Sequence, residues 1–345
     1  MGRRRAKGED HAVVLKRALR RCRSGSVLLI LPPPGLAEAL KCVCGRVRAH
    51  HHFLDCHRRD VRAGVESAWG VRPEEGPRPD TAVLVMPRSK DRARWLLASA
   101  AAALSPGARM VLAGGKRSGA LSMREELQRY VGPVEDDVRA RGCVALVCRR
   151  EGGSAPPPDE LRFSVSAPAG LEVVSLPGVF SHGRLDAGTR MLLAELEGAR
   201  FRRGLDWGCG AGVLGAFLAT SAPEAHVDLC DIDAMAVEAS RLTLAAGGVA
   251  NGSVHGSVGM SDLEGRWDLI ASNPPFHRGG ATDLGPAEML IEGARRRLTR
   301  GGRLMLVANT FLPYERRLAA CFSKVSVLRE EGGFKVLRAR GPLRN

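Results

Sequence analysis

The sequence predicts two consecutive α/β domains, each built around a doubly wound, mostly parallel sheet. Three observations lead to this prediction. Strand-like and helical segments alternate through residues 161–345, and the same order recurs more faintly in residues 1–150. A stretch rich in glycine and proline, residues 151–160, separates the two halves as a linker. The chain of 345 residues is long enough for two such domains.

In the first half, short apolar runs predict strands over residues 26–31, 82–86 and 109–113. Residues 94–104 are expected to form a helix, which a Ser-Pro-Gly turn ends. Because the order of elements matches the second half, we interpret the first half as a diverged copy from an internal duplication. The alternative is two unrelated α/β domains that share generic turns.

The second half alternates more clearly. Expected strands are residues 203–206, 226–230, 267–271, 303–308 and 335–340, and expected helices are residues 213–219, 234–246 and 287–298. In doubly wound folds, ligands bind where the strands end at their carboxyl edge. The residues that follow these strands are therefore the candidates for a functional site.

The charge of the chain is unevenly distributed. The formal net charge is +15, from 52 Lys and Arg against 37 Asp and Glu, and all of the excess lies in residues 1–150. An arginine excess caused only by genome composition should not stop at a linker. We therefore expect a basic surface for a polyanion in the first half.

Cysteines and apolar runs exclude other classes. Nine scattered cysteines, an odd number, indicate reduced thiols in a cytoplasmic protein rather than a disulfide framework. No run of 18 apolar residues occurs, so no membrane partner is expected. Cysteines and histidines gather between residues 42 and 57, but their spacing matches no common structural zinc site, so we expect no metal there.

A glycine-rich turn follows the strand at residues 203–206. Asp206 precedes it, and Gly208, Gly210 and Gly212 alternate through it, which lets the backbone approach a ligand closely. An acid at this place does not suit a pyrophosphate. It suits an ammonium group, such as the methionine end of S-adenosylmethionine.

Asp231 ends the next strand, where a carboxylate can accept hydrogen bonds from both hydroxyls of a ribose. Asp233 follows two residues later and is expected to contribute to the same adenosine site. The alternative for either aspartate is an N-cap of the helix that follows.

The segment Asn273-Pro274-Pro275-Phe276 follows the strand at residues 267–271. The two prolines fix an extended turn. The Asn273 amide oxygen and the Pro274 carbonyl can each accept a proton of an exocyclic amine, and Phe276 can stack on a planar base. Two acceptors favour the pyramidal nitrogen that methylation requires. The alternative is a Pro-Pro turn without a chemical role.

These motifs resemble the class I S-adenosylmethionine-dependent methyltransferases that act on exocyclic amines. More closely, the chain resembles the RsmC-type 16S rRNA guanine-N2 methyltransferases. The resemblance covers most of residues 160–340. It rests on the motifs above and on residues 114–119, 176–181, 185–189, 308–314 and 334–336.

The resemblance implies a fold and a set of roles. It implies two tandem Rossmann-like methyltransferase domains with seven-stranded mixed sheets, the first degenerate. It implies that Phe180 and Asp186 lie at the methionine end of the cofactor, and that the substrate is 16S rRNA in the 30S subunit. A monomer is expected. Two departures concern the cofactor: Trp207 replaces a small aliphatic residue, and Ser257-Val258 stands where the family has an acid or Asn near the adenine, which leaves Ser257 as the candidate.

The first half lacks the chemical groups of the second. Where the second half has Asn-Pro-Pro-Phe, it has Met86-Pro87-Arg88-Ser89-Lys90. We therefore expect the first domain to serve as a scaffold that docks RNA, with Arg88, Lys90, Lys116 and Arg117 as phosphate contacts. In the second half, His277 either contacts the substrate or bonds locally.

Other functions remain open from the sequence. The same box serves methyltransferases of large-subunit rRNA guanine, of adenine N6 and of protein glutamine. An RNA-binding ribosome assembly factor with a decayed methyltransferase fold is the non-enzyme alternative. Cys209 in the glycine turn lacks a partner base, so we do not expect it to act as a nucleophile.

Overall fold

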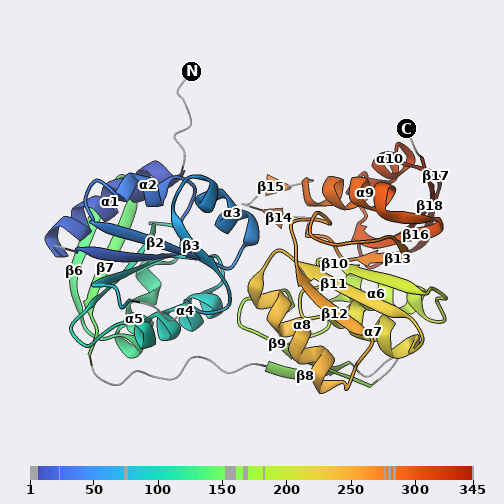
Figure 1. Cartoon of the computed structure of the whole chain (residues 1–345), viewed down its shortest axis with the longest axis horizontal. Helices are drawn as coiled ribbons and strands as arrows, with labels where there is room; N and C mark the ends of the chain where they lie inside the picture. The colour runs from blue at the N-terminus through green and yellow to red at the C-terminus, as the bar shows by residue number, and fades with distance from the viewer. Residues whose placement is uncertain are drawn as a thin grey trace. The chain divides into compact units, whose positions relative to one another are not determined.

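The computed structural model divides into two compact units, Met1–Asp159 and Glu160–Asn345 (Figure 1). It describes residues 7–22, 24–73, 77–151, 161–165, 170–181, 183–275, 277–278, 281–282 and 285–343. None of the helices in this described part of the chain has the length and apolar composition that a membrane span requires.

The first unit is a seven-stranded sheet with helices on both faces (Figure 1). The strand order is β3-β2-β1-β4-β5-β7-β6, parallel except for β6 and β7. Its elements are α1 (Lys7–Cys22), β1 (Ser26–Ile30), α2 (Leu36–Leu40), β2 (Arg46–His51), α3 (Leu54–Arg62), β3 (Glu66–Trp69), β4 (Thr81–Val85), α4 (Lys90–Ala103), β5 (Arg109–Gly115), a 3-10 turn (Leu121–Met123), α5 (Arg124–Tyr130), β6 (Val134–Ala140) and β7 (Cys143–Arg149).

Helix α1 contributes a large part of the core of this unit. Val14, Leu15, Ala18 and Leu19 recur at helical spacing and are fully buried against alternate residues of the central strands. Each buried leucine contributes roughly 1.5–3 kcal/mol of hydrophobic stabilisation. The basic segment at the start of the chain is therefore part of the fold from Lys7 onward.

The second unit repeats the architecture. Its sheet has the order β12-β11-β10-β13-β16-β18-β17, with β17 and β18 antiparallel. Its elements are β8 (Leu161–Val165), β9 (Leu171–Ser175), α6 (Ala187–Leu196), β10 (Arg203–Trp207), α7 (Val213–Ser221), β11 (His226–Asp231), α8 (Ala234–Ala246), β12 (Gly252–Gly256), β13 (Trp267–Ser272), β14 (His277–Arg278), β15 (Ala281–Thr282), α9 (Gly285–Arg297), β16 (Leu298–Asn309), α10 (Tyr314–Ala319), β17 (Phe322–Glu331) and β18 (Phe334–Pro342).

Helices cover both faces of this sheet, with α6, α7 and α8 on one face and α9 and α10 on the other (Figure 1). The core on the second face contains Trp267, Tyr314 and Phe322, which are almost completely buried. Successive side chains along each strand point to opposite faces of the sheet. In β10, this alternation directs Asp206 toward α7 and Leu205 toward α9, since Asp206 bonds to α7 and Leu205 belongs to the second core.

The two sheets share one register, which aligns them residue by residue. Ser26 pairs with Arg46 in the first sheet as Arg203 pairs with His226 in the second. The pairings of β4 and β5 match those of β13 and β16 in the same way. The shared order and register confirm the predicted fold of two tandem domains of one type.

The shared register also places the first unit's counterparts of the predicted site residues. Leu29 takes the position of Asp206, His51 that of Asp231, and Val85 that of Asn273. The first unit therefore presents apolar side chains at two of the three positions, which accounts for its degenerate character.

Candidate active site

The glycine turn between β10 and α7 has the backbone that only glycine adopts without strain. Gly208, Gly210 and Gly212 have φ values of 72°, 57° and 80°. A Cβ atom on Gly208 or Gly210 would meet no heavy atom within 4 Å, whereas one on Gly212 would lie 3.0 Å from the Cα of Ser240. The first two glycines thus leave space beside the turn, and the third allows α8 to pack closely.

Asp206 is buried at the end of β10, with only 1% of its surface exposed. Its Oδ2 accepts a hydrogen bond from the Gly215 amide at 2.8 Å, while Oδ1 is buried with no partner. Burial, with a smaller contribution from the nearby Asp231 carboxylate, raises the pKa of Asp206 to about 7. An unpaired buried carboxylate oxygen is costly and is relieved by a cationic ligand.

Asp231 ties the end of β11 to the glycine turn. Its Oδ2 accepts from the Gly210 amide at 3.1 Å, and its Oδ1 accepts from the Asp233 amide at 3.0 Å. Burial and the Asp233 carboxylate raise the pKa of Asp231 to about 6. Asp233 itself is the N-cap of α8, because its side chain accepts from the Met235 amide at 3.1 Å. The N-cap considered from the sequence is therefore present at Asp233.

Asn273 follows β13 directly and is oriented by two groups from the start of α6. Its Nδ2 donates to Asp186 Oδ2 at 3.1 Å and to Thr189 Oγ1 at 2.9 Å. Asp186 is the N-cap of α6 and also accepts from the Thr189 amide at 3.0 Å. An ionised carboxylate can only accept hydrogen bonds, so the Asn273 amide must present its nitrogen to Asp186. Its Oδ1 is thereby left available on the other side of the amide.

Of the remaining predicted box, Pro274 is buried. Phe276 lies outside the described residues, and His277 is described only as the start of β14. The catalytic role of the box was predicted from the sequence, but the two groups that orient Asn273 were not linked to it. Thr189 was missed as a partner, although Asp186 is of a residue type favoured at helix N-caps, which places Thr189 in the first turn of α6.

Two large aromatic side chains of this unit are exposed in loops outside the Asn273 box. Phe180 is 59% exposed in the segment that precedes α6, and Phe311 is 67% exposed in the loop after β16. The loop of Phe311 is fixed by Lys335, whose buried ammonium group donates to the Thr310 carbonyl and to both carboxylate oxygens of Glu315. Large exposed aromatic side chains are suited to stacking on a base. Phe311 was not among the predicted site residues.

Ser257 follows β12, and its side chain already bonds within its own loop. It is buried, and its hydroxyl lies 3.1 Å from the Gly259 carbonyl and 3.3 Å from Asp262 Oδ2. The same Asp262 oxygen accepts from the Val258 amide at 3.1 Å. Asp262, five residues after Ser257, thus supplies an acid to this loop from a place that the sequence motif did not indicate.

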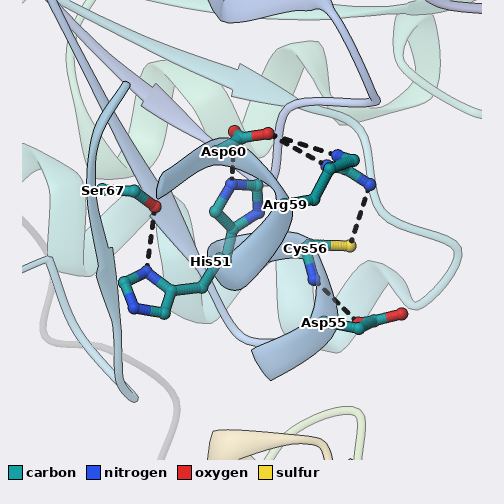
Figure 2. A network of polar contacts seen from close by, with 7 residues as sticks. His51, Asp55, Cys56, Arg59, Asp60 and Ser67 are labelled. Carbon is teal, nitrogen blue, oxygen red and sulfur yellow. Dashed lines mark hydrogen bonds and ion pairs between the residues drawn. The ribbon is translucent and has the colours of Figure 1, made fainter. Parts of the chain in front are cut away.

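In the first unit, His51 stands at the position of Asp231 and belongs to an internal network (Figure 2). Its Nε2 lies 2.8 Å from Asp60 Oδ2, and both side chains are buried. Arg59 donates to the other oxygen of Asp60 and to the sulfur of Cys56 (Figure 2). These side chains stabilise the packing of α3 on β2.

The four basic residues predicted to dock RNA are all exposed. Arg88 and Lys90 follow β4, and Lys116 and Arg117 follow β5, the neighbouring parallel strand. The two loops are in contact, since a Cβ on Gly119 would lie 3.8 Å from the Cε of Lys90. The four cations therefore gather at the carboxyl edge of the first sheet. We call Arg88, Lys90, Lys116 and Arg117 the basic loops.

Fold and site together are those of a methyltransferase built from two tandem domains of one fold. The family model described as Methyltransferase small domain matches residues 170–338, and that described as Methyltransferase small domain N-terminal matches residues 13–155. Ribosomal RNA small subunit methyltransferase C of Pseudomonas entomophila is 43% identical over 297 residues, which cover 84% of this chain and 88% of the relative. The protein of the same name from Salmonella choleraesuis is 38% identical over 304 residues, or 86% of each chain. The chain therefore belongs to the ribosomal RNA small subunit methyltransferase C family.

A solved structure supports the same assignment. The T. thermophilus 16S rRNA N2 G1207 methyltransferase (RsmC), in complex with AdoMet and guanosine, matches with a TM-score of 0.84 and 29% identity. The match covers 96% of this chain and 91% of that one. The predicted resemblance and the predicted class of enzyme are thus confirmed.

Proposed function

We propose that this protein transfers a methyl group from S-adenosylmethionine to the exocyclic N2 of a guanine in the 16S rRNA of the small ribosomal subunit. The observation that carries the proposal is the orientation of Asn273. Asp186 and Thr189 hold its nitrogen, so its amide oxygen remains for an amine of the substrate. The relatives reported above are named as methyltransferases of small-subunit ribosomal RNA.

The residues of the glycine turn fit the cofactor. The unpartnered Oδ1 of Asp206 suits its ammonium group, and the space beside Gly208 and Gly210 suits its chain. Asp231 and Asp233 are proposed to bind the ribose, Ser257 to lie near the adenine, and Phe180 and Asp186 near the methionine end. Bound there, the cofactor supplies an electrophilic methyl group.

The chemistry at the amine requires no strong base. Asn273 Oδ1 and the Pro274 carbonyl each accept one N–H of the guanine amine, which draws the nitrogen lone pair out of conjugation with the ring. Enzymes that modify a base first take it out of its stack. Phe276 is proposed to stack on the base once it is flipped out. The nitrogen then loses its extra proton after attack, so positioning supplies most of the catalysis.

The first unit, which we take as residues 1–150, is proposed to hold the RNA. Its basic loops carry four exposed cations, and Arg88 stands where the second unit continues its catalytic box. In the second unit, His277 is a further candidate for substrate contact. A monomer in the cytoplasm that acts on the 30S subunit accords with these roles.

The test uses labelled S-adenosylmethionine with separate 30S and 50S particles from cells that lack the protein. Methyl incorporation into 30S rRNA at guanine N2 is expected, with none into 50S. Asn273→Ala should lower the transfer rate at least 100-fold and leave the Kd for the cofactor within about twofold. Incorporation into 50S particles instead would assign the other rRNA, and full activity of Asn273→Ala would refute the role of the amide.

A further inference from the structure

A row of cations crosses the antiparallel edge of the second sheet. Arg303 of β16 pairs with Arg340 of β18, and Arg340 pairs in turn with Lys324 of β17. Residues that pair directly across strands point to the same face of a sheet, so the three charges stand side by side. Arg338, two residues before Arg340, adds a fourth on that face. Like charges directly opposite one another destabilise a sheet unless an anion lies between them.

No carboxylate of the described residues lies within 4.0 Å of Arg303, Arg338, Arg340 or Lys324. Arg303 is half-buried, and among the described residues its guanidinium donates only to the Arg200 carbonyl, at 3.2 Å. Burial, followed by the charges of Arg340 and Arg338, lowers its pKa. The fold therefore holds a partly desolvated cation beside two others without an internal counterion in contact.

These arginines line a hollow of about 290 Å³. Its other wall is the end of α6 and the turn at residues 197–200, which adds Arg200. Glu195 and Glu197 line this wall as well, so arginines outnumber acids four to two. A hollow of this volume readily accommodates a phosphate group. A planar guanidinium group can donate two parallel hydrogen bonds to two oxygens of one phosphate. We call Arg200, Arg303, Arg338 and Arg340 the arginine pocket.

The arginine pocket is separate from the candidate active site. Arg303 pairs with Leu269 in β13, four residues before Asn273. Four residues of strand span roughly 13 Å. The pocket thus lies toward the amino end of the parallel strands, whereas Asn273 and the glycine turn lie at their carboxyl ends. The even balance of acids and bases in residues 151–345 conceals this local excess of positive charge.

We propose that the arginine pocket binds a backbone phosphate of the substrate RNA, at a distance from the methylated base. This inference rests on the proposed function, because it takes the polyanion to be the rRNA substrate. Contacts to phosphate position an RNA without reading its sequence, so the pocket should affect RNA affinity and leave the chemical step unchanged.

The experiment compares the double variant Arg338→Gln/Arg340→Gln with a control of equal charge, Arg241→Gln/Arg296→Gln. The control arginines are exposed, and each pairs with a glutamate on its own helix. Binding to 30S particles is measured over a range of salt concentrations, and methylation is measured under saturating cofactor. The pocket variant should bind about tenfold more weakly, with the slope of log K against log salt reduced by about 0.7–0.9, as expected for the loss of one phosphate contact. Its KM for 30S should rise while kcat stays within twofold, and the control should match the wild type.

Each outcome decides between the two proposals. If the wild type methylates 30S and both double variants bind RNA alike, the arginine pocket proposal is wrong and the proposed function stands. If the wild type methylates neither particle but the pocket variant still loses RNA affinity, the proposed function fails and the pocket stands. Thermal stabilisation by inorganic phosphate that the variant loses, with RNA binding unchanged, would make this a small-anion site and overturn the proposal. Arg303→Gln serves as a second variant if the double variant is unstable.

Discussion

Asn273 illustrates how neighbouring side chains decide which end of an amide faces a substrate. The amide could present either its oxygen or its nitrogen to an incoming amine, and only the oxygen can accept a proton. Asp186 removes this ambiguity, because its carboxylate and the Thr189 hydroxyl hold the nitrogen. We regard Asp186 and Thr189 as positioning residues for the proposed reaction.

Substitution of Asp186 tests this role. Asp186→Ala should lower kcat roughly 10- to 100-fold with little change in KM for 30S, and should reduce stability by about 1 kcal/mol through loss of the α6 N-cap. Asp186→Asn should restore the stability and part of the activity, because asparagine also caps helices and can accept from Asn273, although its amide does not dictate the orientation of Asn273 as a carboxylate does. Steady-state kinetics and urea unfolding measure both effects. Equal losses for the two variants would contradict a positioning role.

The proposed contact of Asp206 with the cofactor predicts that cofactor binding depends on pH. Its pKa of about 7 is above the ordinary value for a carboxyl group, so the empty protein takes up a proton as pH falls through 7. An ammonium group binds the ionised form, and its affinity should therefore fall by up to about tenfold per pH unit below 7. Titration calorimetry from pH 8 to pH 5.5 measures the fall. In Asp206→Asn the affinity for the cofactor should be lower than in the wild type at every pH, and should not change between pH 8 and pH 7. A wild-type affinity for the cofactor that is independent of pH would refute the assignment of Asp206.

At the scale of elements, two glycines of the turn are expected to differ in role: Gly212 in packing and Gly210 in ligand binding. Gly210 and Gly212 both have positive φ, so alanine costs about 1–2 kcal/mol in backbone strain at either position. Only at Gly212 would the new methyl group also press on the backbone of α8, 3.0 Å away.

We therefore expect Gly212→Ala to destabilise the protein by more than Gly210→Ala in urea unfolding. Gly210→Ala should instead lower the affinity for the cofactor at least tenfold, because the new methyl group enters the open space beside the turn. Equal unfolding free energies for the two variants would show that α8 moves aside without cost.

Some of the buried strands and helices could be predicted from the sequence, whereas exposed strands and strands interrupted by charged residues could not. Strands β10, β11 and β13 read as short apolar runs that end in polar residues, and α8 was predicted with its observed bounds. Strand β17 was missed because most of its residues are exposed, and β2 because arginine and histidine interrupt it. Asp206 and Asn273 were found because they follow such runs. The contact between Asn273 and Asp186 joins residues 87 positions apart, which no local pattern reports.

At the scale of the whole molecule, two sheets of one register carry different side chains at their carboxyl edges. The second presents Asp206, Asp231 and Asn273, and the first presents Leu29, His51 and Val85 at the same positions. The basic loops occupy this edge in the first unit. These differences are the basis of the proposed division of labour between RNA binding and methyl transfer.

Charge reversal in the basic loops tests the division. Arg88→Glu/Lys90→Glu should weaken 30S binding at least tenfold and flatten its salt dependence, while the Kd for the cofactor stays unchanged. Arg20→Glu/Arg62→Glu, which reverses two exposed cations on helices of the same unit, is the control and should retain binding. Binding is measured by filter retention and the cofactor by calorimetry. Equal RNA binding by both double variants would reject docking through these loops.

The buried carboxyl group of Asp206 has a calorimetric consequence. At neutral pH a substantial fraction of the empty molecules carries a proton on this group, because burial raises its pKa to about 7. When a cationic ligand takes its place beside Oδ1, that proton passes to the buffer. The measured heat of cofactor binding therefore includes the ionisation heat of the buffer. In its proposed role, Asp206 should therefore release a fraction of a proton each time the protein binds the cofactor, and take that fraction back each time the cofactor leaves.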